Sequence, residues 1–203
     1  MNQNFININI RNGKYAVKDA LGAYGVPKAL PKLDSINMEA NVEEQEIYGD
    51  GDLMAILIND KGYTGELVLV SKEHDFEKDL GMAMDLAEVE ADVQILGRPT
   101  IAVYVEVELV TGGVNKTAKV WYLDVVVSRS SDGATQKKDG APAIRTYNYP
   151  IRVTGDFIMN AAGTAIAIDE NGNQRRATRL RKLPTHPNYL TFGDAVPVPK
   201  MSA

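Results

Sequence analysis

Hydrophobic and polar residues alternate along most of this chain, which is the pattern of β-strands that bury one face. A β pattern runs through the stretches 89–96, 100–110, 116–129 and 144–154. A shorter alternation at the start of the chain separates Ile6, Ile8 and Ile10 by asparagines, which predicts a half-buried strand or one that adds to a neighbouring subunit. The chain is therefore expected to contain far more strand than helix.

An apolar run between two turns predicts a long β-hairpin. Gly49 and Gly51 precede the run 53–58, and a second turn at 60–62 follows it. Glycine adopts backbone angles closed to other residues, and aspartate accepts hydrogen bonds from its own turn, so both segments favour tight turns. We expect a buried strand at the apolar run and a hairpin arm over residues 43–62.

One short helix is expected, at about residues 72–80. Ser71 is a suitable N-cap, acidic residues occupy the first turn, and Gly81 follows as a stop. Phe76 and Leu80 lie four residues apart and therefore share one face. We expect that face to pack over the sheet, with the two methionines after Gly81 continuing the contact.

The sequence predicts a mainly β protein, with an antiparallel β-sandwich or half-barrel and one flanking α-helix. With 203 residues and 44% hydrophobic residues, the chain suits one domain with one core. Four segments are expected to extend from this domain: an N-terminal extension (1–32), the hairpin arm (43–62), a mobile loop (130–142) and a C-terminal arm (170–203). The loop is polar and aperiodic, and the C-terminal arm is too rich in proline for a core strand.

Composition excludes several classes of protein. The formal net charge is −5, which disfavours a surface that grips nucleic acid by its phosphates. The chain has no cysteine, so disulfides and thiolate metal sites are excluded and a reducing cytosol is a suitable place to fold. The N-terminus lacks the basic and apolar regions of a signal peptide, and no stretch is long enough to span a bilayer, which predicts a soluble protein.

Acidic side chains recur on one face of three expected strands, at residues 63–70, 102–109 and 120–128. These acidic residues are Glu66, Glu106, Glu108 and Asp124, and Tyr122 shares that face with Asp124. By alternation, hydrophobic residues such as Val103, Val105 and Trp121 fill the opposite face, which is expected to be the core. The acidic side has two interpretations that the sequence leaves open: an ordinary solvated sheet face, or the wall of an acidic channel.

The residues do not indicate an enzyme. Glu106 and Asp124 are carboxylates of the kind that glycosidases use in pairs, but strand faces often carry such residues. The two histidines, His74 and His186, have no partner spaced for zinc. The acidic turns, at residues 50–52 and 169–173, lack the complete pattern of a calcium loop, so plain turns are favoured. We expect no catalytic residue, cofactor or metal.

A basic run near the C-terminus contains Arg175, Arg176, Arg179, Arg181 and Lys182. It has no interleaved aromatic residues, so it is poorly suited to binding nucleic acid. We expect it to pair with acidic patches on a neighbouring subunit, such as Glu43, Glu44 and Glu46.

Four turn and helix-end motifs follow one another between residues 33 and 130. They are Tyr48-Gly49-Asp50-Gly51, Gly62-Tyr63-Thr64-Gly65-Glu66-Leu67, Phe76 with Asp79-Leu80-Gly81, and Ser128-Arg129. In this order they resemble the pattern of major tail tube proteins of long, flexible-tailed bacteriophages of Gram-positive hosts. The regions before Leu33 and after Asp169 match that pattern less clearly.

The resemblance implies a structural virion protein of the phage tail. Six copies would close into a ring, and rings would stack into a hollow tube that conducts phage DNA into the host. The implied partners are further copies of the chain, a tape-measure protein, a tail terminator and distal tail or baseplate proteins. DNA would pass through without specific binding, no membrane would be involved, and assembly would take place in the host cytoplasm.

Within that picture the acidic strand faces line the lumen, where carboxylates repel DNA phosphates over a screening length of about 8–10 Å at physiological salt. Extended segments would reach neighbouring subunits by strand addition. The residues expected at contacts between subunits are Tyr48, Asp50, Asp52, Arg175, Arg176, Arg179, Tyr189 and Phe192.

A β-sandwich module that binds carbohydrate or acts as a surface adhesin is the alternative. Such a module needs a cluster of exposed aromatic residues. The chain has one tryptophan, Trp121, and alternation places it on the core face. Exposed aromatic residues would therefore distinguish this alternative from a tube subunit.

Overall fold

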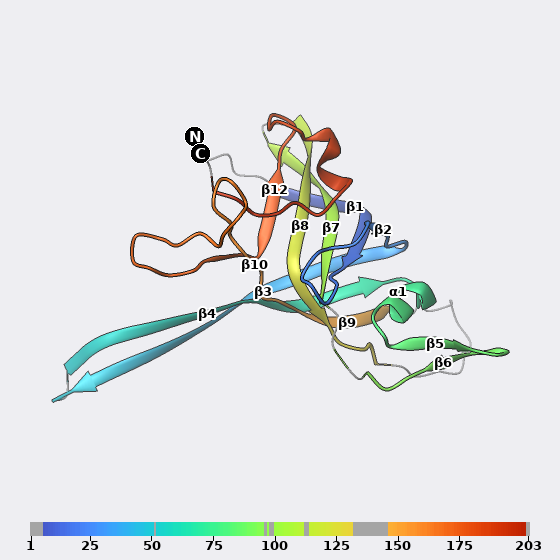
Figure 1. The fold of residues 1–203 in the computed structure, drawn as a ribbon, viewed down its shortest axis with the longest axis horizontal. Helices are drawn as coiled ribbons and strands as arrows, with labels where there is room; N and C mark the ends of the chain where they lie inside the picture. The colour runs from blue at the N-terminus through green and yellow to red at the C-terminus, as the bar shows by residue number, and fades with distance from the viewer. Residues whose placement is uncertain are drawn as a thin grey trace.

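The structure is a computed structural model that describes residues 6–50, 52–95, 97, 100–111, 114–131 and 146–201. Within these residues the protein is mainly β, with antiparallel sheets and a single α-helix, which confirms the predicted fold class (Figure 1). The greater part of the predicted mobile loop, residues 132–142, lies outside the described residues.

One large antiparallel sheet dominates the described fold. Its strands are β1 (Ile6–Val17), β2 (Lys28–Ala29), β3 (Leu33–Gly49), β4 (Asp52–Leu69), β7 (Thr100–Thr111), β8 (Val114–Val127), β9 (Tyr147–Val153) and β12 (Arg179–Lys182). Their order across the sheet is β2-β1-β7-β8-β9-β4-β3, and β12 pairs with β8.

Smaller elements accompany this sheet. They are the pair β5 (Ala83–Leu86) and β6 (Val89–Asp92), the pair β10 (Asp156–Phe157) and β11 (Arg176–Ala177), the helix α1 (His74–Asp79) and a 3-10 turn, η1 (Leu190–Gly193). The strand predicted at 89–96 is therefore shorter in the structure, because β6 ends at Asp92 after pairing with β5.

The sheet forks at β8. One edge of β8 pairs with β7, whereas the other edge changes partner along its length. Residues 119–122 pair with β12, and residues 125–127 pair with β9. Asp124 lies between the two pairings with a backbone φ of 54°, and the register with β7 shifts at the same place. These features define a β-bulge, which bends the strand and inserts one extra residue.

The bulge reverses which side chains of β8 face each side of the sheet. Val125 and Val127 join the main core, whereas Trp121 and Leu123 join a second cluster on the opposite face. Alternation read from the sequence had placed all four on one face, which is wrong because an inserted residue shifts the two-residue period. Tyr122, expected on the wet face, packs against the main core for the same reason.

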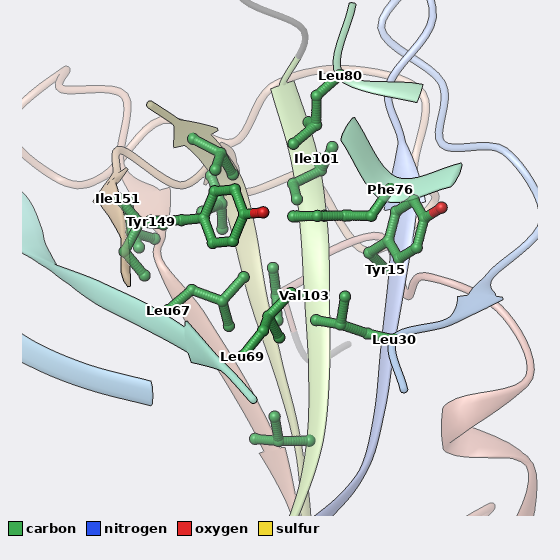
Figure 2. Close-up of a cluster of buried hydrophobic side chains, with 14 of the residues drawn as sticks. Tyr15, Leu30, Leu67, Leu69, Phe76, Leu80, Ile101, Val103, Tyr149 and Ile151 are labelled. Atoms are coloured by element: carbon green, nitrogen blue, oxygen red, sulfur yellow. The ribbon is translucent and has the colours of Figure 1, made fainter. Parts of the chain in front are cut away.

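The main core lies between the sheet and α1. Figure 2 shows Phe76 of the helix between two tyrosines of the sheet, Tyr15 and Tyr149. The ring centroids lie 4.9 Å apart for Phe76 and Tyr15 and 5.6 Å apart for Phe76 and Tyr149, both with edge-to-face geometry. Leu67 and Leu69 of β4 are fully buried beneath them. Such aromatic contacts add to the hydrophobic stabilisation of the core.

The helix is shorter than predicted. Its N-cap is Glu73, which makes no capping hydrogen bond, while Ser71 instead donates its hydroxyl to the Glu73 carboxylate at 2.6 Å. Gly81 ends the helix with a φ of 65°, as the sequence indicates. Phe76 and Leu80 are buried, which confirms that this face packs inward. Of the two methionines that follow, the first is buried and the second is exposed.

The C-terminal arm folds back onto its own sheet. Residues 189–196, here named the C-terminal strap, cover the face that carries Tyr104 and Trp121. Phe192 of the strap is buried in this second cluster. The polar anchors of the strap are Lys14 to the Gly193 carbonyl, Lys119 to the Leu190 carbonyl, Trp121 to the Phe192 carbonyl, and Tyr189 to the Thr117 carbonyl, at 2.8–2.9 Å.

The N-terminal region also belongs to the sheet. β1 pairs with β7 on one side and with β2 on the other, and Tyr15 and Ala16 are buried. The described part of the expected N-terminal extension therefore contains an inner strand of the sheet. Sequence alternation identified the strand, but its partner is a strand of the same chain.

Candidate functional site

The β3–β4 hairpin projects from the rest of the fold. The two strands pair from Leu33 with Leu69 out to Gly49 with Asp52. β9 pairs with β4 only over residues 63–69, so the outer part of the hairpin is a ribbon of two strands (Figure 1). This outer part includes the hairpin arm expected at residues 43–62.

Strand β4 of the hairpin arm is apolar on both faces. The run is Leu53, Met54, Ala55, Ile56, Leu57 and Ile58. Every member is exposed, so the expectation of a buried strand at this run is wrong for the single chain. Met54 is 73% exposed and Ile58 is 67% exposed. Successive strand residues point to opposite faces, so the chain itself covers neither face of this run. A continuous apolar strand is typical of one that is buried on both sides, and a bare two-stranded ribbon is marginally stable in water.

Strand β3 of the arm and the turn at its tip are acidic. Residues 34–60 contain no lysine or arginine and eight carboxylates, which are Asp34, Glu39, Glu43, Glu44, Glu46, Asp50, Asp52 and Asp60. Cross-strand pairing sets Glu44 opposite Ile58 and Glu46 opposite Ile56. The arm is therefore divided along its length into an acidic strand and an apolar strand.

The tip and the base of the arm depend on particular backbone positions. Tyr48 is 61% exposed at the tip and donates its hydroxyl to the Glu46 carboxylate, and Asp50 adopts a positive φ of 53° in the turn. At the base, a Cβ on Gly65 would lie 1.9 Å from the Asn37 carbonyl oxygen. A glycine is therefore required there for the two strands to approach each other.

A basic groove of about 590 Å³ lies at the base of the arm. Its cationic residues are Lys61, Arg152, Arg175 and Arg176. Lys61 pairs with Glu43 at 2.5 Å, and Arg175 pairs with Asp169 at 2.9 Å. The side chain of Arg152 is exposed and makes no hydrogen bond or ion pair with the other described residues. The lining thus combines these four cations with one carboxylate, Asp60, and the side chains of Arg152 and Arg175 are exposed to solvent.

The remaining arginines of the basic run are held within the chain. The Arg176 guanidinium lies 4.0 Å from the centroid of the Phe157 ring and donates to the Gly155 carbonyl at 3.1 Å. Arg179 interacts with the hydroxyl of Tyr122, and this contact works against the burial that raises the pKa of that phenol. These contacts fix two of the arginines that the sequence assigned to intersubunit pairing.

A half-buried polar network surrounds the fork in the sheet. Lys18 donates to the carboxylates of Asp124, at 2.8 Å, and Asp156. The hydroxyl of Tyr24 donates to the second oxygen of Asp156 at 2.7 Å and accepts the backbone N–H of Asp124 at 3.0 Å. Burial lowers the pKa of Lys18, but the hydrogen bonds to both carboxylates outweigh burial, so that pKa lies above its usual value.

Asp124 therefore differs from the lumen residue that alternation suggested. Its carboxylate also accepts the hydroxyl of Thr154 and lies 3.8 Å from Arg176. The side chain is 18% exposed, and these contacts hold the bulge at the fork. Its role in the structure is to connect the two branches of the sheet.

Glu106 and Glu108 lie on the face of the sheet that the strap partly covers. Glu106 accepts hydrogen bonds from Tyr104 at 2.9 Å and Asn12 at 2.7 Å. Arg11 pairs with Glu108 at 3.0 Å and lies 3.9 Å from Glu106. The negative charge of both glutamates is therefore offset by a neighbouring cation.

Glu66 has a different setting. It is exposed on the outward face of β4, where register places it beside Asn37 of β3 and Pro150 of β9. The amide of Asn148 lies 3.5 Å from its carboxylate. Among the four lumen candidates, Glu66 is the one whose carboxylate faces solvent without an ion pair to another described residue.

The two candidate contact residues of the strap are turned toward their own chain. Tyr189 is half-buried with the Lys119 ammonium 4.9 Å from its ring, and Phe192 is buried under Trp121 and Tyr104. By contrast, the neighbouring Leu190 is 81% exposed. In this structure Tyr189 and Phe192 hold the strap against its own sheet, whereas the side chain of Leu190 is exposed to solvent.

The acidic turn at residues 169–173 is held by hydrogen bonds to Asp169. That carboxylate accepts the backbone N–H groups of Asn171 and Asn173 and pairs with Arg175, and these contacts lower its pKa. His74 pairs with Asp85 at 2.7 Å, which raises the pKa of the imidazole. No group of three or more metal-ligating side chains is present in the part of the chain that the structure describes.

No family model matches this chain, and no curated protein matches its sequence. Within the described residues, no helix is long and apolar enough to cross a membrane.

Sequence reasoning missed two features of the candidate site. It missed the basic groove, because Arg152 and Lys61 come from different strands, and it missed the division of the arm into an acidic strand and an apolar strand. The block of carboxylates without a cation from 34 to 60 was the available signal for the latter.

Proposed function

We propose that this chain is a structural subunit that assembles with copies of itself. Specifically, it is a major tail tube subunit whose hexameric rings stack into a hollow conduit for phage DNA. The observation that most supports self-assembly is the hairpin arm, which exposes six consecutive apolar residues on a ribbon without support from its own chain. Exposed apolar patches of this kind mark contact surfaces, and the acidic strand beside this one keeps the free subunit soluble.

The outward face of β9, β4 and β3 is the candidate lumen wall. It carries Glu39, Glu66 and the exposed cation Arg152, together with neutral residues such as Asn37 and Thr64. Closing copies of this sheet around an axis removes exposed strand edges, and its carboxylates repel DNA phosphates. Arg11 and Lys18 pair with the other candidates, so Glu66 and Glu39 carry the repulsion in this proposal.

A carbohydrate-binding or adhesin-like module is the second candidate, without a specific observation in its favour. Trp121, the residue best suited to stack on a sugar ring, is fully buried, and so are Tyr104 and Tyr149. Tyr48 is exposed, but it stands at the tip of the ribbon. The self-assembling subunit is therefore the better supported candidate, because the exposed apolar run of the hairpin arm is larger than the single exposed tyrosine at its tip.

Sedimentation velocity over a concentration series tests the proposal. The wild-type chain is expected to shift from monomer to large species, and the double substitution Ile56→Asp with Ile58→Asp is expected to remain monomeric. Leu21→Asp is the matched control, since Leu21 is 95% exposed but lies outside the arm. A wild-type chain that stays monomeric at every concentration and binds glycans would favour the second candidate.

A further inference from the structure

The basic groove adjoins an apolar pocket across the β10–β11 pair. This pocket has a volume of about 480 Å³ and is lined chiefly by apolar side chains, including Phe157, Met159, Ile166, Val196 and Val198. Arg176 lines the groove and Phe157 lines the pocket, and the two residues pair directly between β10 and β11. The stacking of Arg176 over Phe157 therefore marks the boundary between a basic half and an apolar half of one surface.

This surface and the hairpin arm are complementary in two respects. The surface sets cations beside an apolar hollow, and the arm sets carboxylates beside an apolar strand. In the arm, Glu44 and Glu46 lie directly across from Ile58 and Ile56, so acidic and apolar groups lie about one strand spacing apart. A partner that matched the groove by charge alone would leave the pocket unfilled.

We propose that the hairpin arm of a second copy of this chain lies across the β10–β11 pair. The carboxylates of its β3 strand contact the basic groove, and the apolar side chains of its β4 strand cover the apolar pocket. This inference rests on the proposed self-assembly and specifies the surface at which copies meet.

Charge within the groove favours such an occupant. Arg152 has no partner among the described residues, and Arg175 is 70% exposed although it pairs with Asp169. Both cations are therefore available to an incoming carboxylate. The run of residues 34–60 supplies eight carboxylates and contains no lysine or arginine, and only Glu43 among them pairs with Lys61 of the same arm. Complementary charges of this kind steer association and fix the register of an interface.

The proposed contact joins two different surfaces of the same chain. Such a head-to-tail contact closes into a ring or continues as an open filament, depending on the rotation between copies. The base of the recipient's own arm, Asp60 to Gly62, also lines the groove. An incoming arm would therefore lie beside the arm of the recipient, which lets each copy receive one arm and offer one.

A charge-swap experiment on the full chain tests the contact. The first variant reverses the arm (Glu44→Arg with Glu46→Arg), the second reverses the groove (Arg152→Glu with Arg175→Glu), and a third combines all four changes. Each double variant is expected to require at least a tenfold higher concentration for assembly, and the combined variant is expected to recover most of that loss. The four side chains substituted in the double and combined variants are exposed, and circular dichroism checks that each variant folds. The control for net charge compares two single variants, Arg152→Glu and Lys116→Glu. Both change the charge of the chain by the same amount, but Lys116 lies outside the groove.

The outcomes separate this contact from self-assembly itself. If the wild type assembles and the groove variant assembles at the same concentration, the contact is refuted while the proposed function stands. If both double variants lose assembly and the combined variant fails to regain it, the arm and groove do not meet each other. A wild type that never assembles overturns both proposals.

Discussion

Trp121 donates its indole N–H to the backbone carbonyl of Phe192 at 2.8 Å, and the Phe192 side chain packs in the same cluster. This relationship joins the middle of β8 to a segment near the C-terminus. It exists because the bulge at Asp124 turns Trp121 away from the main core. The C-terminal strap is therefore part of the folded subunit.

Substitution of Phe192 by alanine tests the strap. Loss of a buried phenylalanine from this small cluster is expected to lower the free energy of unfolding by about 3 kcal/mol. The chain has one tryptophan, so its fluorescence reports directly on exposure of Trp121, and a shift to longer wavelength is expected. The control is Leu190→Ala, at an 81% exposed position, which should change stability by less than about 0.5 kcal/mol. Equal effects of the two substitutions would contradict the strap's role.

Lys18 is predicted to stabilise the fork in the sheet. Replacement by methionine leaves Asp124 and Asp156 close together without the shared cation, so the free energy of unfolding is expected to fall by about 3 kcal/mol. The comparison is Lys28→Met, which removes an exposed pair with Asp79 and should cost less than about 1 kcal/mol. Urea unfolding of both variants measures the difference. Lys18→Met with wild-type stability would show that the network does not hold the fork.

Gly65 is predicted to be essential for the base of the arm. A methyl group there would meet the Asn37 carbonyl at 1.9 Å, so Gly65→Ala should separate β3 from β4 and destabilise the protein by about 2–3 kcal/mol. Gly97→Ala provides a matched control, because a Cβ added at Gly97 would meet no atom of the other described residues within 4 Å. Thermal unfolding followed by circular dichroism distinguishes them. Similar melting temperatures for the two variants would contradict this account.

Stability is predicted to fall at alkaline pH because of four tyrosines. Each hydroxyl donates to a carboxylate, in the pairs Tyr15–Asp79, Tyr24–Asp156, Tyr104–Glu106 and Tyr149–Glu77. Burial, followed by these hydrogen bonds, raises the pKa of every one of these phenols. A pKa that is higher in the folded state contributes stability that is present below the unfolded value, about 10, and is lost as the pH rises above it.

Two measurements check this prediction. The first is the urea concentration at the midpoint of unfolding. The four tyrosines should not change this midpoint up to about pH 9, and it should fall above about pH 10 as they ionise in the unfolded chain. The second is the absorbance of ionised tyrosine, which should rise in two stages. The other tyrosines should titrate first, and the four that donate to carboxylates should titrate only as the protein unfolds. A single ordinary titration of all tyrosines, without loss of structure, would show that the hydroxyls are not held as described.

The sequence was informative where local patterns decide structure. Alternation identified the strands, and the spacing of Phe76 and Leu80 with Gly81 identified the helix, because these signals act within a few residues. The bulge at Asp124 was not predictable, since it is held by Lys18 and Thr154 from distant parts of the chain. One inserted residue there moved Trp121 to the other face.

One part of the candidate site could be predicted from local sequence patterns, and another part could not. The hairpin arm could be predicted because its turns and its apolar run are continuous in the chain. The basic groove could not, since Lys61, Arg152 and Arg175 meet only when β4, β9 and the segment before β11 come together. The ion pairs of Arg11 with Glu108 and of Lys18 with Asp124 likewise arise from strand register, which composition does not reveal.

The most direct test of the central claim is negative-stain electron microscopy of the purified full chain over a rising concentration series. A tail tube subunit is predicted to give hollow rings with six-fold symmetry, and stacked tubes at the higher concentrations. Particles that remain single chains throughout, or that associate into solid clusters without a central channel, would contradict the account.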